Sequence, residues 1–226
     1  MHSGSFFSSV LISLLLVGQL LFPSDLIAQD GGSYLPNPSL EGEPREDEPP
    51  PDWEPCKENS TPDTQPGFWE VTQAPSEGES YVGLVTRGDL GPYAKATEDV
   101  GTELREPLRP DSCYRLLVDL SLSKEQGHTI GFGSSFLSYD TSAILKIWGG
   151  GSFCEKRELL GELGPVDDSA WKTYELIIRP EKAIFFLSFE ADHKRSPEYF
   201  GNILMDHIRI GPLKETLRKM DTTVRK

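Results

Sequence analysis

The sequence predicts an all-β protein whose strands form an antiparallel β-sandwich. Short stretches in which apolar and polar residues alternate recur along the 226 residues, and Gly, Pro and Asp separate them. In the clearest stretch, Tyr114, Leu116 and Val118 share one face, and polar residues stand between them. Segments with the period of a helix are almost absent, which disfavours a parallel sheet covered by helices.

Six segments carry the strand pattern. Gly149–Gly151 and Pro180 each end one of them, because neither residue type continues a strand well. In a late segment, Phe185, Leu187 and Phe189 are expected to share one buried face. The expected strands are residues 80–86, 114–123, 143–148, 171–179, 183–191 and 203–210.

The chain divides into a leader, one domain and a tail. Residues 1–28 have the form of a signal peptide, with an apolar run too short to span a bilayer comfortably and an expected cleavage after Ala28. A retained membrane anchor is the alternative. The mature chain is expected to have no transmembrane segment. Residues 29–211 form the predicted sandwich domain, and the basic tail over residues 212–226 has apolar residues at helical spacing.

Residues 42–66 are rich in proline and in acidic residues. Proline lacks the N–H that a strand ladder needs, and neighbouring carboxylates repel one another. We therefore expect a long loop that contains neither a helix nor a paired strand. Trp53 and Cys56 are expected to attach this loop to the body of the domain.

Charge and cysteines restrict the partners and the compartment. The formal net charge of −14 argues against nucleic acid as a partner, because such a surface repels phosphate backbones. Export would place Cys56, Cys113 and Cys154 in an oxidising compartment, where one disulfide and one remaining thiol are expected. We predict the pair Cys56–Cys154, because both lie in Gly/Pro-rich segments where covalent closure helps most. Other pairings stay open.

Motifs at both ends and in the middle of the domain form a recognisable set. They are residues 37–41 (Asn-Pro-Ser-Leu-Glu), 60–69, 80–87, 145–150, 171–174, 197–202 and 201–210. Together they resemble the carbohydrate-binding-module-like or galactose-binding-like jelly rolls of Bacteroidota surface and gliding-motility-associated proteins, which often accompany type IX secretion. The resemblance implies a non-catalytic jelly roll at the cell surface, outside the cell or at the periplasmic face of the outer membrane.

The same resemblance implies a structural calcium ion. In the related jelly rolls, an acid of the opening motif and an Asp of the closing strand share this metal, and here those positions are Glu41 and Asp206. Calcium prefers oxygen ligands such as carboxylates. The alternative is that Asp206 caps a turn or faces solvent, although an acid that alternates into an apolar face needs a partner.

Aromatic and polar residues also meet in residues 63–69. Sugar rings stack their C–H faces on Trp and Tyr, and their hydroxyls need polar partners. The predicted ligand-binding residues are Asp63, Gln65, Trp69, Arg87 and Tyr139, with Trp148 expected nearby. For Trp69 the alternative is a place in the core.

Little in the sequence supports catalysis. Residues 131–135 lack the spacing of a nucleophile elbow. Glu190, Asp192 and Glu198 could form a carboxylate pair, but a chain with 36 acidic residues yields such pairs by chance. We therefore expect a module that binds glycan without catalysis. The alternative is a protein-interaction subunit of an outer-membrane secretion or gliding-motility complex.

Overall fold

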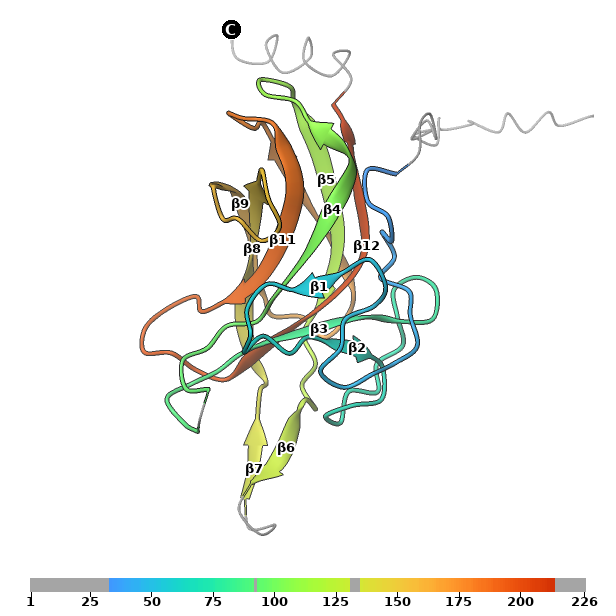
Figure 1. Cartoon of the computed structure of the whole chain (residues 1–226). Helices are drawn as coiled ribbons and strands as arrows, with labels where there is room; N and C mark the ends of the chain where they lie inside the picture. The colour runs from blue at the N-terminus through green and yellow to red at the C-terminus, as the bar shows by residue number, and fades with distance from the viewer. Residues whose placement is uncertain (1–32, 92, 131–134, 214–226) are drawn as a thin grey trace, which may run out of the picture. The chain divides into compact units, whose positions relative to one another are not determined.

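The structure is a computed structural model that describes residues 33–91, 93–130 and 135–213. Within these ranges the chain forms twelve β-strands and no helix, which confirms the predicted all-β class (Figure 1). The expected signal peptide lies outside the described residues. The tail was expected over residues 212–226, but Pro212 ends the last strand, and residues 214–226 lie outside the described ranges. In the described part no helix is long and apolar enough to span a membrane.

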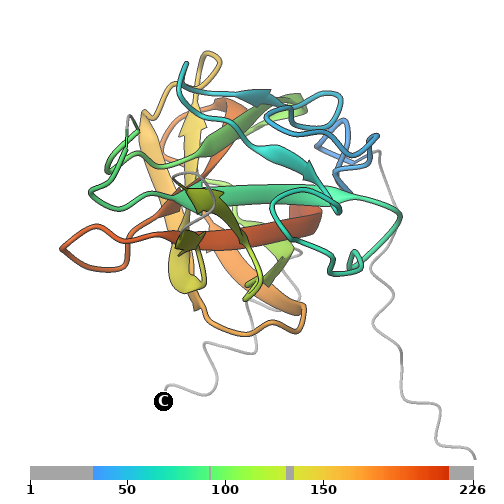
Figure 2. The same cartoon turned by 90° about the horizontal axis from the view of Figure 1, so that it is seen from below.

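Ten strands form two five-stranded sheets. In spatial order the first sheet comprises β1 (Glu54–Pro55), β4 (Asp99–Leu108), β11 (Ile184–Asp192), β8 (Thr141–Gly150) and β9 (Glu158–Val166). The second comprises β2 (Asp63–Gln65), β3 (Tyr81–Thr86), β12 (Gly201–Pro212), β5 (Tyr114–Ser121) and β10 (Lys172–Ile178). Neighbours within each sheet are antiparallel, as β3 and β12 show side by side in Figure 2. A short parallel pairing of β8 with β12 joins the sheets.

One hydrophobic core lies between the two sheets. Alternate residues of β5 and β8 point into it, as the sequence pattern predicts: Leu116, Val118, Leu145 and Ile147 are fully buried. Trp53 packs into the same core and donates from Nε1 to the Asn37 carbonyl at 2.9 Å. Two antiparallel sheets over a shared core are a β-sandwich of the jelly-roll type, and the predicted fold class is confirmed.

The expectation that Phe185 shares the inner face of β11 is wrong. Leu187 and Phe189 are buried, whereas 45% of Phe185 is exposed. The register of β11 against β4 shifts between Ile184 and Phe186. Because side chains alternate with a period of two, this irregularity turns Phe185 out of the inner face.

The expectation of an unpaired loop over residues 42–66 is wrong in part. Glu54–Pro55 pairs with β4, and Asp63–Gln65 pairs with β3. Both short strands are edge strands. A proline is tolerated there because the outer side of an edge strand forms no ladder hydrogen bonds. Arg45 forms a further bridge to Thr64. The acidic segment thus extends both sheets.

The predicted disulfide between Cys56 and Cys154 is present. It connects the residue after β1 to the loop between β8 and β9. Gly101 of β4 lies directly beneath it, and a Cβ there would come within 3.0 Å of Cys56 Sγ and 2.9 Å of Cys154 Sγ. Glycine is required at this position because the sulfur atoms approach the backbone so closely. Cys113 has a free thiol.

A hairpin of β6 (Gly127–Ile130) and β7 (Ser135–Ser138) projects from the sandwich (Figure 1). Asn202 of β12 fixes its base. The Asn202 Nδ2 donates to the carbonyls of Ser123 at 2.6 Å and Tyr139 at 2.8 Å, and its Oδ1 accepts from the Ser123 N–H at 2.9 Å. The buried side chain therefore determines where the hairpin leaves the sheet.

Candidate functional site

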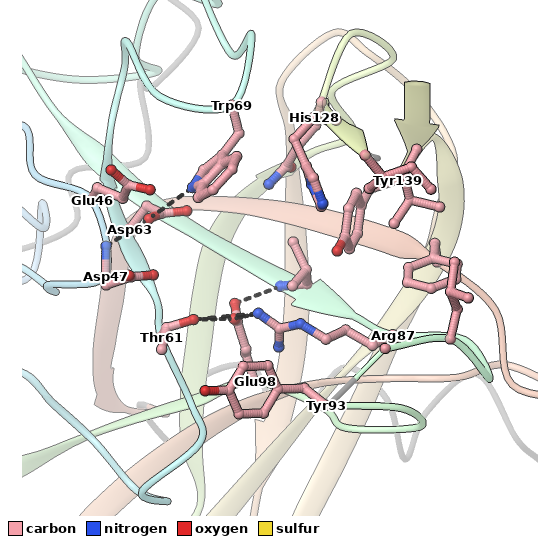
Figure 3. Close-up of a pocket in the computed structure, with 18 residues that line it drawn as sticks. Glu46, Asp47, Thr61, Asp63, Trp69, Arg87, Tyr93, Glu98, His128 and Tyr139 are labelled. Atoms are coloured by element: carbon pink, nitrogen blue, oxygen red, sulfur yellow. Dashed lines mark hydrogen bonds and ion pairs between the residues drawn. The ribbon is translucent and has the colours of Figure 1, made fainter. Parts of the chain in front are cut away.

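A cavity of about 560 Å³ lies where the β6–β7 hairpin meets the end of β3 and the loops around β2 (Figure 3). Five aromatic rings contribute to its lining, and so do several charged and polar side chains. The aromatic residues are Trp69, Tyr93, His128, Tyr139 and Phe200, and the polar ones include Thr61, Asp63, Arg87, Glu98 and Gln126. Concave sites of this size that combine apolar walls with a few polar groups are typical of small-ligand sites.

Four of the rings form one continuous wall. The ring centroids lie 5.3 Å apart for Trp69 and His128, 5.9 Å for His128 and Tyr139, and 5.2 Å for Tyr139 and Phe200. Edge and tilted contacts at these distances restrict how each ring can turn. The wall therefore offers a stiff apolar surface to the cavity.

Arg87 and Glu98 form a buried ion pair beside this wall. The Arg87 Nη2 lies 2.7 Å from Glu98 Oε1, which also accepts from Thr61 Oγ1 at 2.9 Å. The Val85 N–H donates to the other Glu98 oxygen at 2.9 Å. Burial raises the pKa of Glu98, and the charge of Arg87 opposes that rise. Tyr93 places its ring 5.7 Å from the Arg87 guanidinium carbon.

Asp63 is the second buried acid of the cavity. Its Oδ1 accepts from the Asp47 N–H at 2.8 Å and from the Trp69 Nε1 at 3.3 Å (Figure 3). Burial raises its pKa to about 7, and the charges of Glu98 and Asp47 add to the rise. Among the described residues, no lysine or arginine forms an ion pair with Asp63. This carboxyl group therefore titrates near neutral pH.

Two buried polar atoms on the lining have no hydrogen-bond partner within the described residues. They are Nη1 of Arg87, a donor, and Oε1 of Gln126, an acceptor. Gln126 as a whole is 2% exposed. A buried polar group without a partner costs about 1–3 kcal/mol. Both atoms are enclosed by protein, and the Arg87 side chain also interacts with the Tyr139 hydroxyl, so they are buried polar groups behind the cavity wall.

The structure brings four of the five predicted ligand-binding residues to this cavity. They are Asp63, Trp69, Arg87 and Tyr139. Gln65 is fully buried and does not line it, because its side-chain amide is turned to the backbone of Phe68, at 3.1 and 3.3 Å. Gln65 holds the turn that presents Trp69. Trp148 also lies elsewhere, and its Nε1 donates to Glu190 at 3.0 Å.

Several lining residues were not expected from the sequence. The sequence around Glu98 does not distinguish this buried acid from the many exposed acids of the chain. Gln126 and His128 belong to a hairpin whose strands are too short for a clear alternation. The Gly-rich stretch between His128 and Tyr139 was the one usable sign of a hairpin.

The residues predicted to hold calcium reach one loop from two sides. Asp206 is fully buried, and its Oδ2 accepts from the N–H groups of Ser76 at 2.8 Å and Glu77 at 3.0 Å. Glu41 accepts from the Glu79 N–H at 3.0 Å. Burial raises the pKa of Asp206 to about 6, and the charge of Glu41 adds to the rise.

As placed, these two carboxylates do not fit a calcium ion. They face N–H groups, whose positive ends would repel a cation, and they hold residues 76–79 in place. In the described ranges no group of three or more His, Cys, Asp or Glu side chains is arranged to hold a metal ion. Calcium binding stays a prediction, and a rise in melting temperature on adding Ca²⁺ would support it.

The acids considered for a catalytic pair lie outside the cavity lining. Glu190 forms ion pairs with Lys57 at 2.8 Å and with Lys156 at 2.7 Å. Asp192 pairs with Lys146. A carboxylate held between two lysines is ionised and stabilised in that state, which suits a structural role.

No protein-family model and no curated protein matches this chain. Solved structures match it in fold. A cyclase from Fischerella sp. TAU, in complex with 4-(1H-indol-3-yl)butan-2-one, is 14% identical, with a TM-score of 0.54 over 81% of this chain and 98% of its own. Similarity at this identity shows the fold alone, and decides neither for nor against catalysis.

Two further structures are similar at lower scores. The K1 cleaved adhesin domain of Lys-gingipain from Porphyromonas gingivalis W83 has a TM-score of 0.47 and 12% identity over 78% of this chain and 96% of its own. The C-terminal CBM6 of LamC, a marine laminarinase from Zobellia galactanivorans, has a TM-score of 0.37 and 12% identity over 61% and 84%. Scores below 0.5 carry no argument about this chain.

Proposed function

We propose that this chain is a non-catalytic module that binds a glycan in the cavity. The observation that carries the proposal is the stiff aromatic wall beside buried polar groups in a cavity of about 560 Å³. A sugar presents apolar C–H faces that stack on rings, and hydroxyls that need donors and acceptors. The lining residues Thr61, Asp63, Arg87 and Gln126 carry side-chain donors and acceptors of this kind.

Trp69 is the stacking residue in this proposal. Its backbone is held at a φ of 52°, and that of Glu70 at 64°, in the left-handed region that costs non-glycine residues about 1–3 kcal/mol. Its indole donates to Asp63, and its carbonyl accepts from the Gly127 N–H at 3.1 Å. Gln65 holds the turn behind it. Such strain is common where a fold presents a binding residue.

Binding of the purified chain to a glycan array, followed by titration of the best glycan, tests the proposal. We expect Trp69→Ala to weaken binding at least about tenfold, because the stacking surface is lost. Phe153→Ala is the matched control, since Phe153 is an exposed ring that does not line the cavity. Melting curves of both variants show whether they are folded.

Two results would contradict the proposal. If folded Trp69→Ala keeps the affinity of the parent chain, Trp69 does not stack the ligand. If no glycan on a broad array binds and a stoichiometric protein partner copurifies from the envelope, the alternative function as a protein-interaction subunit of an outer-membrane complex replaces it.

We also propose that the mature chain works outside the cytoplasm, at the cell surface or at the periplasmic face of the outer membrane. The disulfide supports this, because such bonds persist in oxidising compartments. The proposal includes the division into a leader over residues 1–28, the domain and the tail. Sequencing of the exported protein should then begin at Gln29.

A further inference from the structure

The cavity carries more negative charge than its cation balances. Four carboxyl groups line it, from Glu46, Asp47, Asp63 and Glu98. Among the described lining residues Arg87 is the one lysine or arginine, and it is paired with Glu98 at 2.7 Å. The other three acids therefore face the cavity without a cation. Figure 3 shows these three on one side of the cavity, with Tyr139 on the opposite side.

Asp63 differs from the other two because it is buried, at 4% exposure, whereas Glu46 and Asp47 are exposed. Its Oδ1 is occupied by the Asp47 N–H and the Trp69 indole, and no hydrogen bond within the described residues reaches its Oδ2. A buried carboxylate needs a partner of opposite charge or must take up a proton. The cavity side of Asp63 thus has a place for a positive group.

Among the described residues that line the cavity, the one lysine or arginine is Arg87, and its guanidinium is paired with Glu98 and not with Asp63. The charged and titratable side chains around the cavity are Glu46, Asp47, Arg87, Tyr93, Glu98, His128 and Tyr139. Burial, Glu98 and Asp47 together raise the pKa of Asp63 to about 7. A positive group that binds beside Asp63 would favour its ionised form and release the proton that part of the molecules carry near neutral pH.

An independent observation points to a ligand with hydroxyl groups. The Oε1 of Gln126, in a side chain that is 98% buried, has no partner among the described residues, and neither does the Nη1 of Arg87. A hydroxyl group can donate to the first or accept from the second. Gln126, Arg87 and Asp63 line the same cavity, so a ligand that reaches Asp63 lies beside these polar side chains.

We propose that the glycan bound in this cavity is an amino sugar with a free, protonated amine, and that Asp63 receives its ammonium group beside the Trp69 indole. The inference rests on the proposed function, because it names the class of glycan. A carboxylate next to an aromatic ring is a strong site for an ammonium group. An acidic sugar would meet three uncompensated carboxyl groups, and an N-acetylated sugar brings no charge to balance them.

Three β-1,4-linked oligosaccharides of equal length test this directly. Oligomers of glucosamine, N-acetylglucosamine and glucose differ at carbon 2 alone, which carries an ammonium, an acetamide or a hydroxyl group. By titration calorimetry at about pH 6.5, we expect the glucosamine oligomer to bind at least about tenfold tighter than the other two. Repeating the titration at a pH low enough to keep the ligand amines protonated, in buffers of different ionisation enthalpy, should show proton release with the glucosamine oligomer alone.

The variant Asp63→Asn removes the charge and keeps the shape. We expect it to abolish the preference for glucosamine over glucose and the proton release. Asp52→Asn is the matched control, because Asp52 is an exposed acid that does not line the cavity. It removes the same charge from the chain and should leave the preference intact, which separates a specific site from general attraction to an acidic surface.

Each contrary result has a distinct meaning. If the three oligomers bind equally, or the preference survives in Asp63→Asn, the inference is wrong while glycan binding stands. If none of the three binds, the inference is wrong and the wider glycan array decides on the proposed function. A preference that Asp52→Asn abolishes as fully as Asp63→Asn would also overturn the site.

Discussion

Two groups of buried carboxyl groups in this sandwich are balanced in opposite ways. In the first, which we call the ion cluster, Asp99 and Glu190 on neighbouring strands β4 and β11 meet Lys57 and Lys156. All four oxygen–nitrogen distances lie between 2.7 and 3.1 Å. Burial favours the protonated form of Glu190, but Lys156 and Lys57 outweigh it and lower the pKa to about 2.

Among the described lining residues of the cavity, the two buried acids Glu98 and Asp63 have a single lysine or arginine beside them. Arg87 pairs with Glu98, and Asp63 is left with hydrogen bonds alone, so its pKa rises to about 7. The ion cluster balances both carboxylates with two lysines and does not line the cavity, although Asp99 Oδ1 has no hydrogen-bond partner within the described residues. The cavity keeps an unmet charge, and strongly perturbed groups in concave sites are typical of binding and catalysis. The ion cluster thus stabilises the fold, whereas the cavity can recognise another molecule.

The largest expected effect on stability comes from removing the disulfide, whose two cysteines lie close in sequence to the two lysines of the ion cluster. Lys57 follows Cys56, and Lys156 stands two residues after Cys154. The bridge closes a sequence separation of 98, so the double variant Cys56→Ala/Cys154→Ala should lose about 4 kcal/mol of unfolding free energy in urea. Glycan affinity of the folded variant should be unchanged, and a loss would show that the two regions are coupled.

Glu190→Gln should cost about 3 kcal/mol, because two lysines lose a carboxylate that is 10% exposed. Since the pKa of Glu190 is lowered, its contribution to the free energy of unfolding is fully present above pH 4.5. This contribution is lost as the pH falls toward about 2. The difference in unfolding free energy between variant and parent should therefore shrink between about pH 6 and about pH 3. A constant difference would mean that the ion pairs are not its source.

Asp63→Asn should act in the opposite direction and stabilise the chain by about 2 kcal/mol above pH 7. The pKa of Asp63 is raised from 3.8 to about 7. The favourable contribution of Asp63 to the free energy of unfolding is therefore present below pH 3.8 and lost as the pH rises through 7. The full linkage corresponds to about 4 kcal/mol, and we expect half because the Asn amide adds a donor that also needs a partner. Urea unfolding at pH 5 and pH 8 measures this, and destabilisation at pH 8 would contradict the comparison.

The smallest expected effect on stability is that of Gln126→Met. It removes a buried acceptor that has no partner among the described residues, so the free energy of unfolding should rise by about 1 kcal/mol. Glycan affinity should fall about fivefold, because a hydrogen bond to the ligand is lost. Unfolding and titration of the same sample measure both. Unchanged affinity would remove Gln126 from the site.

The sequence predicted the sandwich because its central strands alternate regularly. Leu116 and Val118, or Leu145 and Ile147, are buried as their spacing indicates. It missed β4 and β9, where runs such as Glu103-Leu104-Arg105-Glu106 carry too few apolar residues for a clear period. It also missed the bulge that turns Phe185 outward, since a bulge depends on pairing with β4 and not on local pattern.

The site could be predicted in part. The aromatic and polar residues of 63–69 pointed to it because they stand together in one turn. Glu98 and Gln126 could not be found, because their environment results from tertiary contacts: Glu98 meets Thr61, which is 37 residues away, and Gln126 stands at the base of the hairpin, where its carbonyl accepts from the Tyr139 N–H. The ion cluster escaped prediction for the same reason, since Lys57 and Glu190 are 133 residues apart.

A carbon-13 NMR titration of the Asp63 carboxyl group, assigned with Asp63→Asn, shows whether the free chain leaves this charge unbalanced and whether an ammonium group balances it. In the free chain we expect this carbon to titrate near pH 7, and in the presence of the glucosamine oligomer the midpoint should fall by at least about one pH unit. A midpoint near pH 4 in the free chain would mean that its charge is already balanced. A midpoint that stays near pH 7 when the oligomer is bound would mean that no ammonium group reaches Asp63.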